Sequence, residues 1–285
     1  MNTTKKRIFY SLYTIVAIIF FLYLLFPSDK IKKFIEYKAS SIKPGYTMEI
    51  ENVTLALPPG INLHMPRIFH NNELLVDMEQ AKITPSFLSL AGSNPEFNIK
   101  IRAYNGIINT KLNLNKTDIP IQADSILEGI QIKQIKALQD LSDYNLAGVL
   151  GGKIIYKGTR SSGVADADIS ISNCIVELKT PFFNLKNLMF TQIDAKMTLH
   201  DFQNLQIKKT IIKGNQAGGN ISGTITLKNP SEKSILNLSG TIKPQPALIA
   251  KLGNMASLFF KQKQGNTGFH FKITGTLKKP RFSLK

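Results

Sequence analysis

Most of the chain after residue 45 alternates between apolar and polar positions. From Phe97 to Ala103, the odd positions are apolar and the even positions are Asn98, Lys100 and Arg102. A period of two is typical of a β-strand with one face on a core and the other in water. The pattern predicts strands at 97–103, 193–199, 221–227 and 269–277, and shorter or bulged ones at about 46–57, 61–65, 74–83, 106–114, 152–158, 164–178, 205–213 and 235–242. We therefore expect a mainly β fold with about a dozen strands separated by turn residues.

Three segments follow a helical period instead. Residues 30–42 carry apolar side chains at helical spacing before Pro44-Gly45, and residues 247–260 carry Leu248, Leu252, Met255 and Phe259 on one helical face. Residues 132–141 suggest another short helix, although 130–132 could equally be strand. We expect the last two helices to pack on or cap a sheet rather than bind a partner.

The N-terminus contains a long apolar run. Ile8 to Phe26 is 19 uncharged, mostly apolar residues, preceded by Lys5-Lys6-Arg7. As a helix it would be about 28 Å long, close to a hydrocarbon core of about 30 Å. The run therefore predicts a transmembrane anchor from Ile8 to Phe26. The alternatives are a cleaved signal peptide, which usually has a shorter apolar region and a small-x-small cleavage site, and a buried soluble helix.

This anchor divides the chain into a cytoplasmic tail (1–7), a transmembrane helix (8–26) and a β-rich domain (28–285). Basic residues flank both ends of the run, so the positive-inside rule alone does not decide its orientation. We expect the N-terminus inside, because a seven-residue tail is too short to carry a function. In a bacterium, the inner membrane would then hold the anchor and the β-rich domain would be periplasmic.

Composition and charge narrow the classes of protein that fit. The chain has 285 residues, 36 Lys and Arg, 19 Asp and Glu, a net charge of +17 and 43% hydrophobic residues. This apolar fraction is too high for a disordered basic tail. Because the lysines are spread over many predicted strands and turns, we expect no nucleic-acid partner, but an anionic lipid surface or an acidic neighbour. The single Cys174 excludes an intrachain disulfide, and we expect it to be buried.

The sequence contains no recognisable catalytic motif. It lacks a nucleophile elbow, a phosphate loop and a HExxH pair. The four histidines (His64, His70, His200 and His270) are scattered singly, and we expect them to be exposed on strands or loops. We therefore expect no enzyme activity, no cofactor and no metal.

Two carboxylate pairs and one glycine pair resemble functional motifs only superficially. Asp77 and Glu79 lie two residues apart, as do Asp166 and Asp168, so each pair would share one face of a strand. Such pairs are common on solvated sheets, although they could in principle act as a general acid and base. Gly151-Gly152-Lys153 lacks the Ser or Thr of a phosphate loop and is expected to form a turn.

A weak repeat gives the most informative pattern. The segments 221–225, 238–242 and 273–277 share a large apolar residue, a hydroxyl, Gly, Thr and a second large apolar residue; 146–150 is a looser relative. Their central glycines, which remove a side chain from the apolar positions, are Gly223, Gly240, Gly275 and Gly148. We expect either a bend that coils a long sheet or an apolar groove able to hold an acyl chain.

The order of motifs resembles the type II secretion system protein N (GspN) family. The motifs are Phe26-Pro27-Ser28-Asp29, Pro44-Gly45-Tyr46, Ala56-Leu57-Pro58-Pro59-Gly60, residues 83–92 and the closing residues 271–282. The last motif is also similar to that of AsmA-like proteins, which share a one-span anchor and long coiled β-sheets.

The resemblance implies two functions. The first is an inner-membrane-anchored periplasmic accessory or structural component of the type II secretion system, with other secretion subunits as partners. The alternative, from the AsmA-like features, is a lipid-contacting or lipid-transfer protein of the bacterial envelope, with an open or partly closed, mostly antiparallel sheet. The family supplies no catalytic residues.

Overall fold

The fold is dominated by one long antiparallel sheet. The computed structural model describes residues 3–41, 44–56, 60–90, 92, 94–114, 121–140, 144–159, 162–182, 185–252 and 268–284. Fourteen strands are hydrogen-bonded to one another in the order β17-β16-β15-β14-β13-β12-β11-β10-β9-β8-β7-β6-β3-β2. These strands are β2 (Asn52–Ala56), β3 (Gly60–His64), β6 (Gln80–Pro85), β7 (Glu96–Ala103), β8 (Gly106–Leu114), β9 (Ile121–Gln131), β10 (Tyr144–Gly158), β11 (Gly163–Phe182), β12 (Leu185–His200), β13 (Asn204–Lys213), β14 (Ala217–Thr226), β15 (Ile235–Pro244), β16 (Phe269–Thr276) and β17 (Pro280–Leu284).

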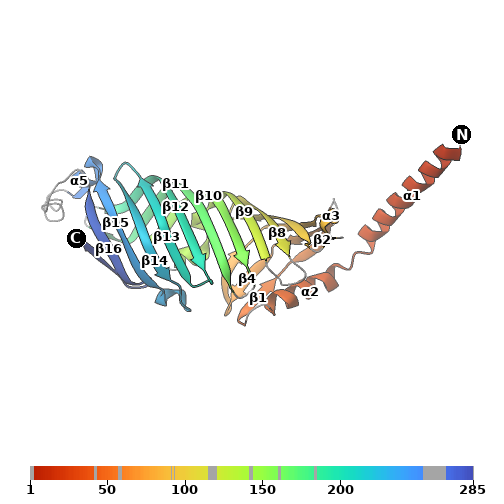
Figure 1. Cartoon of the computed structure of the whole chain (residues 1–285), viewed down its shortest axis with the longest axis horizontal. Helices are drawn as coiled ribbons and strands as arrows, with labels where there is room; N and C mark the ends of the chain where they lie inside the picture. Colours follow the sequence, from red (N-terminus) through yellow and green to blue (C-terminus); the bar gives the residue numbers. More distant parts are fainter. Residues whose placement is uncertain are drawn as a thin grey trace.

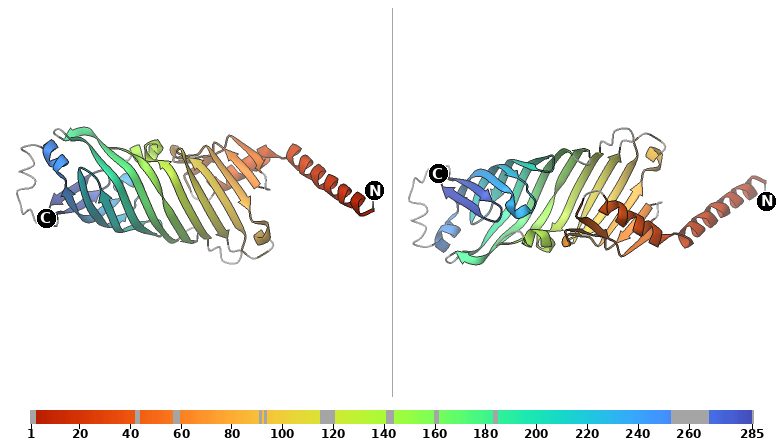
Figure 2. Two further views of the ribbon diagram at one scale, coloured as in Figure 1. Left: turned by 90° about the horizontal axis from the view of Figure 1, so that it is seen from above. Right: turned by 90° about the horizontal axis from the view of Figure 1, so that it is seen from below.

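The sheet is elongated and strongly twisted. From β6 to β17 each strand pairs with the next in sequence, so the sheet grows in one direction along the chain (Figure 1). The views from above and below show that it curls rather than lying flat (Figure 2). Twist of this kind follows from the right-handed preference of L-residues. The predicted mainly β fold is confirmed.

Two helices and a small sheet occupy the N-terminal end. Helix α1 (Thr3–Leu24) extends away from the sheet, whereas α2 (Ser28–Ser40) lies along its first strands (Figure 1). The small sheet has the order β1-β4-β5 and consists of β1 (Tyr46–Glu49), β4 (Arg67–His70) and β5 (Glu73–Asp77). The predicted helix at 30–42 is thus confirmed, and it ends before Pro44.

The N-terminal run is helical, but it ends earlier than predicted. In the part of the chain that the structure describes, no helix is long and apolar enough to cross a membrane. Ile8 lies in α1, with its side chain outside the described set. Phe26 follows α1, is half-buried and packs on the N-terminal core. It does not continue the helix because it precedes Pro27, and a proline disfavours helical backbone at the residue before it.

The N-terminal core joins α2 to both sheets. Its buried residues are Ile50, Val53, Leu63 and Ala81, and Phe26, Ile31, Ile35 and Met48 are among the partly buried residues that pack on them. A carboxylate oxygen of Glu36 in α2 also accepts a hydrogen bond from the backbone N–H of Ile50 at 2.8 Å. Apolar packing and this bond fix α2 against the first strands of the sheet.

Three short helices follow in the connections. They are α3 (Phe87–Leu90), α4 (Lys136–Asp140), which follows a 3₁₀ turn at Ile132–Gln134, and α5 (Pro246–Leu252). The helix predicted at 247–260 is confirmed up to Leu252. The helix predicted at 132–141 is confirmed only from Lys136, because residues 132–134 form the 3₁₀ turn. Leu141, at the end of the first predicted range, and Met255 and Phe259 of the second lie outside the described residues.

The structure contains more strands than we expected. The described residues form 17 strands, for two reasons. Two predicted strands are each divided between the two sheets, 46–57 into β1 and β2 and 74–83 into β5 and β6. Three strands, β4, β9 and β17, were not predicted. Asp77 ends β5 and Glu79 lies between the strands, so the prediction that they share a strand face is wrong. Gly151-Gly152-Lys153 lies inside β10 and forms no turn, because both neighbouring strands continue to pair across it.

Candidate functional site

One face of the large sheet is apolar across all fourteen strands. Residues paired across an antiparallel ladder point to the same face, so the register can be followed from strand to strand. One such row, the central row, is Leu55, Ile61, Ile83, Ile99, Thr110, Ser125, Ile154, Ala167, Met197, Ile207, Gly223, Leu238, Ile273 and Phe282. It contains no charged residue. Its two hydroxyls satisfy each other, because Thr110 Oγ1 and Ser125 Oγ are hydrogen-bonded at 2.9 Å.

A second row runs parallel to the first and has the same character. It consists of Val53, Leu63, Ala81, Ile101, Ile108, Leu127, Gly152, Ile169, Ala195, Thr210, Ile221, Gly240, Phe271 and Leu284. We call the surface formed by these two rows the apolar face. The alternate residues, most of them polar or charged, form the polar face.

The apolar face is packed at its two ends and less covered in the middle. The N-terminal core lies at β2, β3 and β6, and a second cluster forms where Leu248 of α5 meets Ala217, Phe190 and Ile242. Ile154 of β10, Met197 of β12 and Ile207 of β13 belong to neither cluster and are only half-buried. The described residues form no third cluster of buried apolar side chains there.

The less-covered part is large enough to hold a chain-like apolar ligand. Neighbouring strands are about 4.8 Å apart, so the four steps from β9 to β13 extend about 19 Å. One leaflet of a bilayer has an acyl layer of about 15 Å, half of the hydrocarbon core. An acyl chain lying across the strands would therefore fit between the two packed ends.

The four glycines of the sequence repeat are required by the backbone. Gly223, Gly240 and Gly275 lie on the apolar face, and Gly148 lies at a register shift in β10. Gly223 has φ of 138°, and a Cβ there would lie 2.3 Å from the carbonyl oxygen of Asn237. At Gly240, a Cβ would lie 2.0 Å from the carbonyl oxygen of Asn220. These close approaches leave no room for a Cβ at Gly223 or Gly240. Both predicted roles of the glycines, bending the sheet and shaping a groove, remain predictions.

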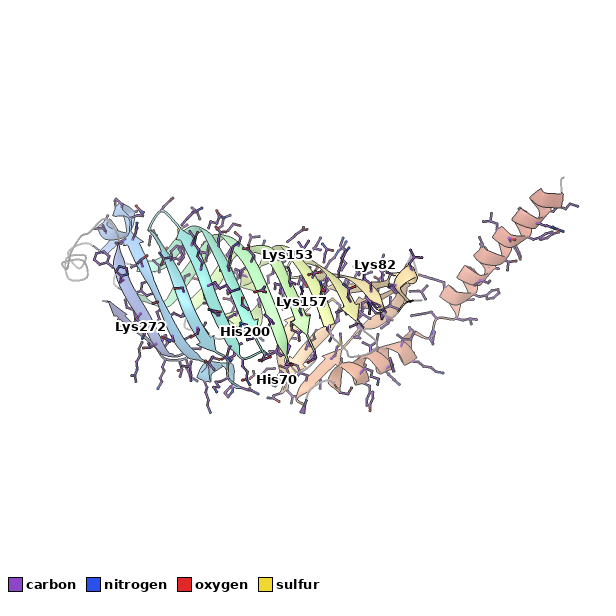
Figure 3. All side chains as sticks on the ribbon, in the orientation of Figure 1. His70, Lys82, Lys153, Lys157, His200 and Lys272 are labelled. Atoms are coloured by element: carbon purple, nitrogen blue, oxygen red, sulfur yellow. The ribbon has the colours of Figure 1, made fainter. Side chains whose placement is uncertain are left out.

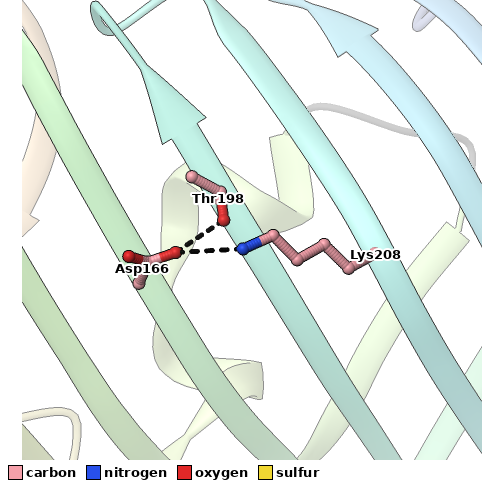
Figure 4. Close-up of polar contacts among 3 residues, drawn as sticks. All are labelled: Asp166, Thr198 and Lys208. Atoms are coloured by element: carbon pink, nitrogen blue, oxygen red, sulfur yellow. Dashed lines mark hydrogen bonds and ion pairs between the residues drawn. The ribbon is translucent and has the colours of Figure 1, made fainter.

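The polar face of β11 to β13 carries paired charges. Asp166 accepts hydrogen bonds from Thr198 Oγ1 at 2.6 Å and from Lys208 Nζ at 3.3 Å (Figure 4). Asp168 forms an ion pair with Lys196 at 3.1 Å. Asp166 and Asp168 thus share a strand face as predicted, and each has a cationic partner. Lys196 reaches Asp168 from the adjacent strand β12, and Lys208 reaches Asp166 from β13, two strands away. Their arrangement is that of cross-strand ion pairs on a solvated sheet.

The environment of Asp166 gives a testable pH dependence. The hydrogen bond from Thr198, and then Lys208, hold the pKa of the Asp166 carboxyl below its ordinary value. Because the folded pKa is depressed, the stabilisation is present above the unfolded pKa and is lost as the pH falls through the folded one. We expect Thr198→Val to raise the Asp166 pKa, measured by NMR titration of the carboxyl carbon from about pH 2 to 6. An unchanged pKa would contradict the assignment, and Thr191→Val, outside this contact, is the control.

The lone cysteine and the four histidines are the other residues that the sequence analysis singled out. Cys174 is buried, as expected, and burial raises the pKa of its thiol. His200 and His270 are exposed as expected, whereas His64 and His70 are half-buried; His64 Nε2 lies 3.0 Å from Thr54 Oγ1. Within the described ranges, no group of three or more His, Cys, Asp or Glu could hold a metal ion.

Sequence reasoning missed the middle of the apolar face because β9 interrupts the alternation. In β9, Ser125 lies on the apolar face, and Ile126, which is 47% exposed, lies on the polar face. The sequence of this segment therefore lacks the alternation that indicates a strand. The hydroxyl partner, Thr110, belongs to the preceding strand. Only pairing β8 with β9 reveals that Ser125 is satisfied there.

Comparisons with known proteins do not place the chain in a family. No family model, curated protein or solved structure matches it.

Proposed function

We propose that the protein binds the acyl chains of envelope lipids on its apolar face, as a lipid-contacting or lipid-transfer protein. The observation that carries this proposal is the pair of uncharged rows that cross all fourteen strands and are only half-buried in the middle. Each methylene removed from water contributes about 0.8 kcal/mol, so even partial contact with one acyl chain is favourable. Apolar surfaces of this extent on soluble domains commonly mark interaction sites.

We further propose that α1 anchors the protein in a bacterial inner membrane, with residues 28–285 in the periplasm. The support is the 19-residue uncharged run in the sequence and the exposure of its aromatic side chains, including Tyr10, Tyr13 and Tyr23. Tyr residues favour the membrane–water interface. Helix α1 also extends away from the sheet, where a bilayer could surround it (Figure 1).

Native mass spectrometry of the full chain tests the lipid proposal. The protein would be purified from membranes in a mild non-ionic detergent and its detergent removed by collisional activation. The control is a single-span protein in which residues 1–27 are fused to an unrelated soluble domain. At a collisional activation that strips the lipids from this control, we expect phospholipid adducts to remain on the full chain. Adducts no more persistent than those of the control would contradict the proposal, because they would arise from α1 alone.

A second candidate function is an accessory role in type II secretion. It is favoured by the ordered motifs from Phe26 to Gly92, which resemble the secretion protein N family. Among the described residues of these motifs, Phe26 and Ile83 pack on the N-terminal core, so these two positions would help to preserve a fold shared with that family. Residues 57–59 lie outside the described part. Co-purification through a C-terminal tag should recover secretion subunits. Recovery of none would count against this role and leave the lipid proposal intact.

A further inference from the structure

The polar face contains a basic depression on the first half of the sheet. This depression lies over β6 to β10 and has a volume of about 590 Å³, the size of a small-ligand site. Its polar-face lining consists mainly of Lys82, Lys100, Lys111 and Lys153, with Asn98 and Asn109. Lys82 lies toward the N-terminal end of the sheet, with Lys153 and Lys157 further along on β10 (Figure 3). This depression lies on the surface opposite the apolar face.

Two of these lysines are held directly against each other. Lys82 and Lys100 are opposite residues in the β6–β7 ladder, which places their Cβ atoms about 4.5–5.5 Å apart. Like charges directly opposite each other destabilise a sheet. In the β8–β9 ladder, Lys111 lies opposite Asp124, which is the one acidic residue among those that line the depression.

Three of the four lysines in this depression lack the ion pairs that two lysines form further along the described sheet. On β12 and β13, Lys196 and Lys208 are paired with Asp168 and Asp166. Within the described chain, Lys100, Lys111 and Lys153 take part in no ion pair. Asp124 already accepts a hydrogen bond from Gln122. The depression itself therefore carries an excess of positive charge, since four lysines line it and Asp124 is the acidic residue among its lining.

We propose that this depression is a binding site for a phosphate-bearing anion. Ammonium groups on several neighbouring strands supply positive charge from different directions, and the amides of Asn98 and Asn109 supply neutral hydrogen-bond donors. Phosphate groups combine high charge with several acceptor oxygens, which suits this set of donors. The phosphate can come from a lipid head group or from a soluble phosphorylated compound. The site does not depend on the occupant of the apolar face.

The test uses the full chain in a non-ionic detergent at low salt. Inorganic pyrophosphate, dihexanoyl phosphatidylglycerol and dihexanoyl phosphatidylcholine are titrated separately by isothermal calorimetry. We expect saturable binding of pyrophosphate, of the phosphatidylglycerol or of both, and weaker binding of the zwitterionic lipid. Tighter binding of phosphatidylglycerol than of pyrophosphate identifies a lipid head group as the source, and the reverse order identifies a soluble compound.

Matched variants locate the site. We expect Lys100→Gln with Lys111→Gln to weaken binding at least tenfold, because two charge-assisted contacts are lost. Lys272→Gln, on the polar face of β16, should change it less than twofold. Without ligand, Lys100→Gln should melt at a higher temperature than the wild type because the like-charge pair is removed, and pyrophosphate should no longer raise its melting temperature as much.

Three results would overturn the proposal. They are the absence of saturable binding of both anions, equal binding of the anionic and zwitterionic lipids, and an equal loss of binding in the Lys272→Gln control. Each concerns the polar face and leaves lipid binding on the apolar face to be judged by its own experiment.

Discussion

Replacing Gly223 with alanine is expected to lower the free energy of unfolding by about 3–5 kcal/mol. The backbone at Gly223 has φ of 138°, which L side chains rarely adopt. The new Cβ would also meet backbone atoms of Asn237 and Leu238 at 2.3 and 2.8 Å. Because these are main-chain atoms of the neighbouring strand, they cannot rotate away, and β14 and β15 would have to separate locally.

Gly151→Ala is the matched control for this prediction. Gly151 also lies in a long strand, but its Cβ would meet its nearest neighbour, the carbonyl oxygen of Leu127, at 3.4 Å, and its φ is not in the left-handed region. We expect its stability to stay within about 1 kcal/mol of the wild type, because alanine costs less conformational entropy than glycine in a strand. Urea unfolding of both variants, followed by far-UV circular dichroism, makes the comparison. Equal stability of the two variants would show that Gly223 does not hold the strands in close approach.

Replacing Ile207 with aspartate is expected to reduce the phospholipid bound to the full chain at least tenfold. Ile207 lies in the central row between Met197 and Gly223 and is half-buried. A carboxylate at this position would lie under the proposed acyl chain, and transfer of an unpaired charge into apolar surroundings is strongly unfavourable.

Ile211→Asp provides the same chemical change on the other side of the same strand. Ile211 pairs with Asp194 and Asn220 on the polar face and is 37% exposed. We expect it to retain bound lipid. Met197→Gln, nearly equal in shape, gives a milder test that remains informative where Ile207→Asp lowers the melting temperature. Equal lipid content in all three variants would show that the central row is not the lipid site.

Much of the fold could be predicted from periodicity alone. The alternation in Phe97–Ala103 and Ile193–Leu199 corresponds to β7 and part of β12, and the helical period after Lys30 corresponds to α2. These segments have one polar and one apolar face, so the local pattern contains the same information as the tertiary contacts. The division of residues between two sheets has no such local signal, since β5 and β6 are almost contiguous in sequence.

The candidate sites depended on register, which single-strand patterns do not reveal. Lys82 and Lys100 each look like ordinary solvated residues until the β6–β7 ladder places them opposite each other. Ser125 looks unsuitable for an apolar face until β8 supplies Thr110 as its hydrogen-bond partner. The repeat glycines were visible in the sequence, but the backbone atoms that require them belong to the adjacent strands.

Photo-crosslinking in living cells tests the lipid-binding face most directly. A benzophenone amino acid would replace Met197 on the apolar face in one variant and Ile211 on the polar face in the other, in the full membrane-bound chain. We predict covalent phospholipid adducts at position 197 after irradiation, with few or none at position 211. Adducts of equal yield at the two positions, or none at position 197 in a folded protein, would contradict lipid binding on the apolar face.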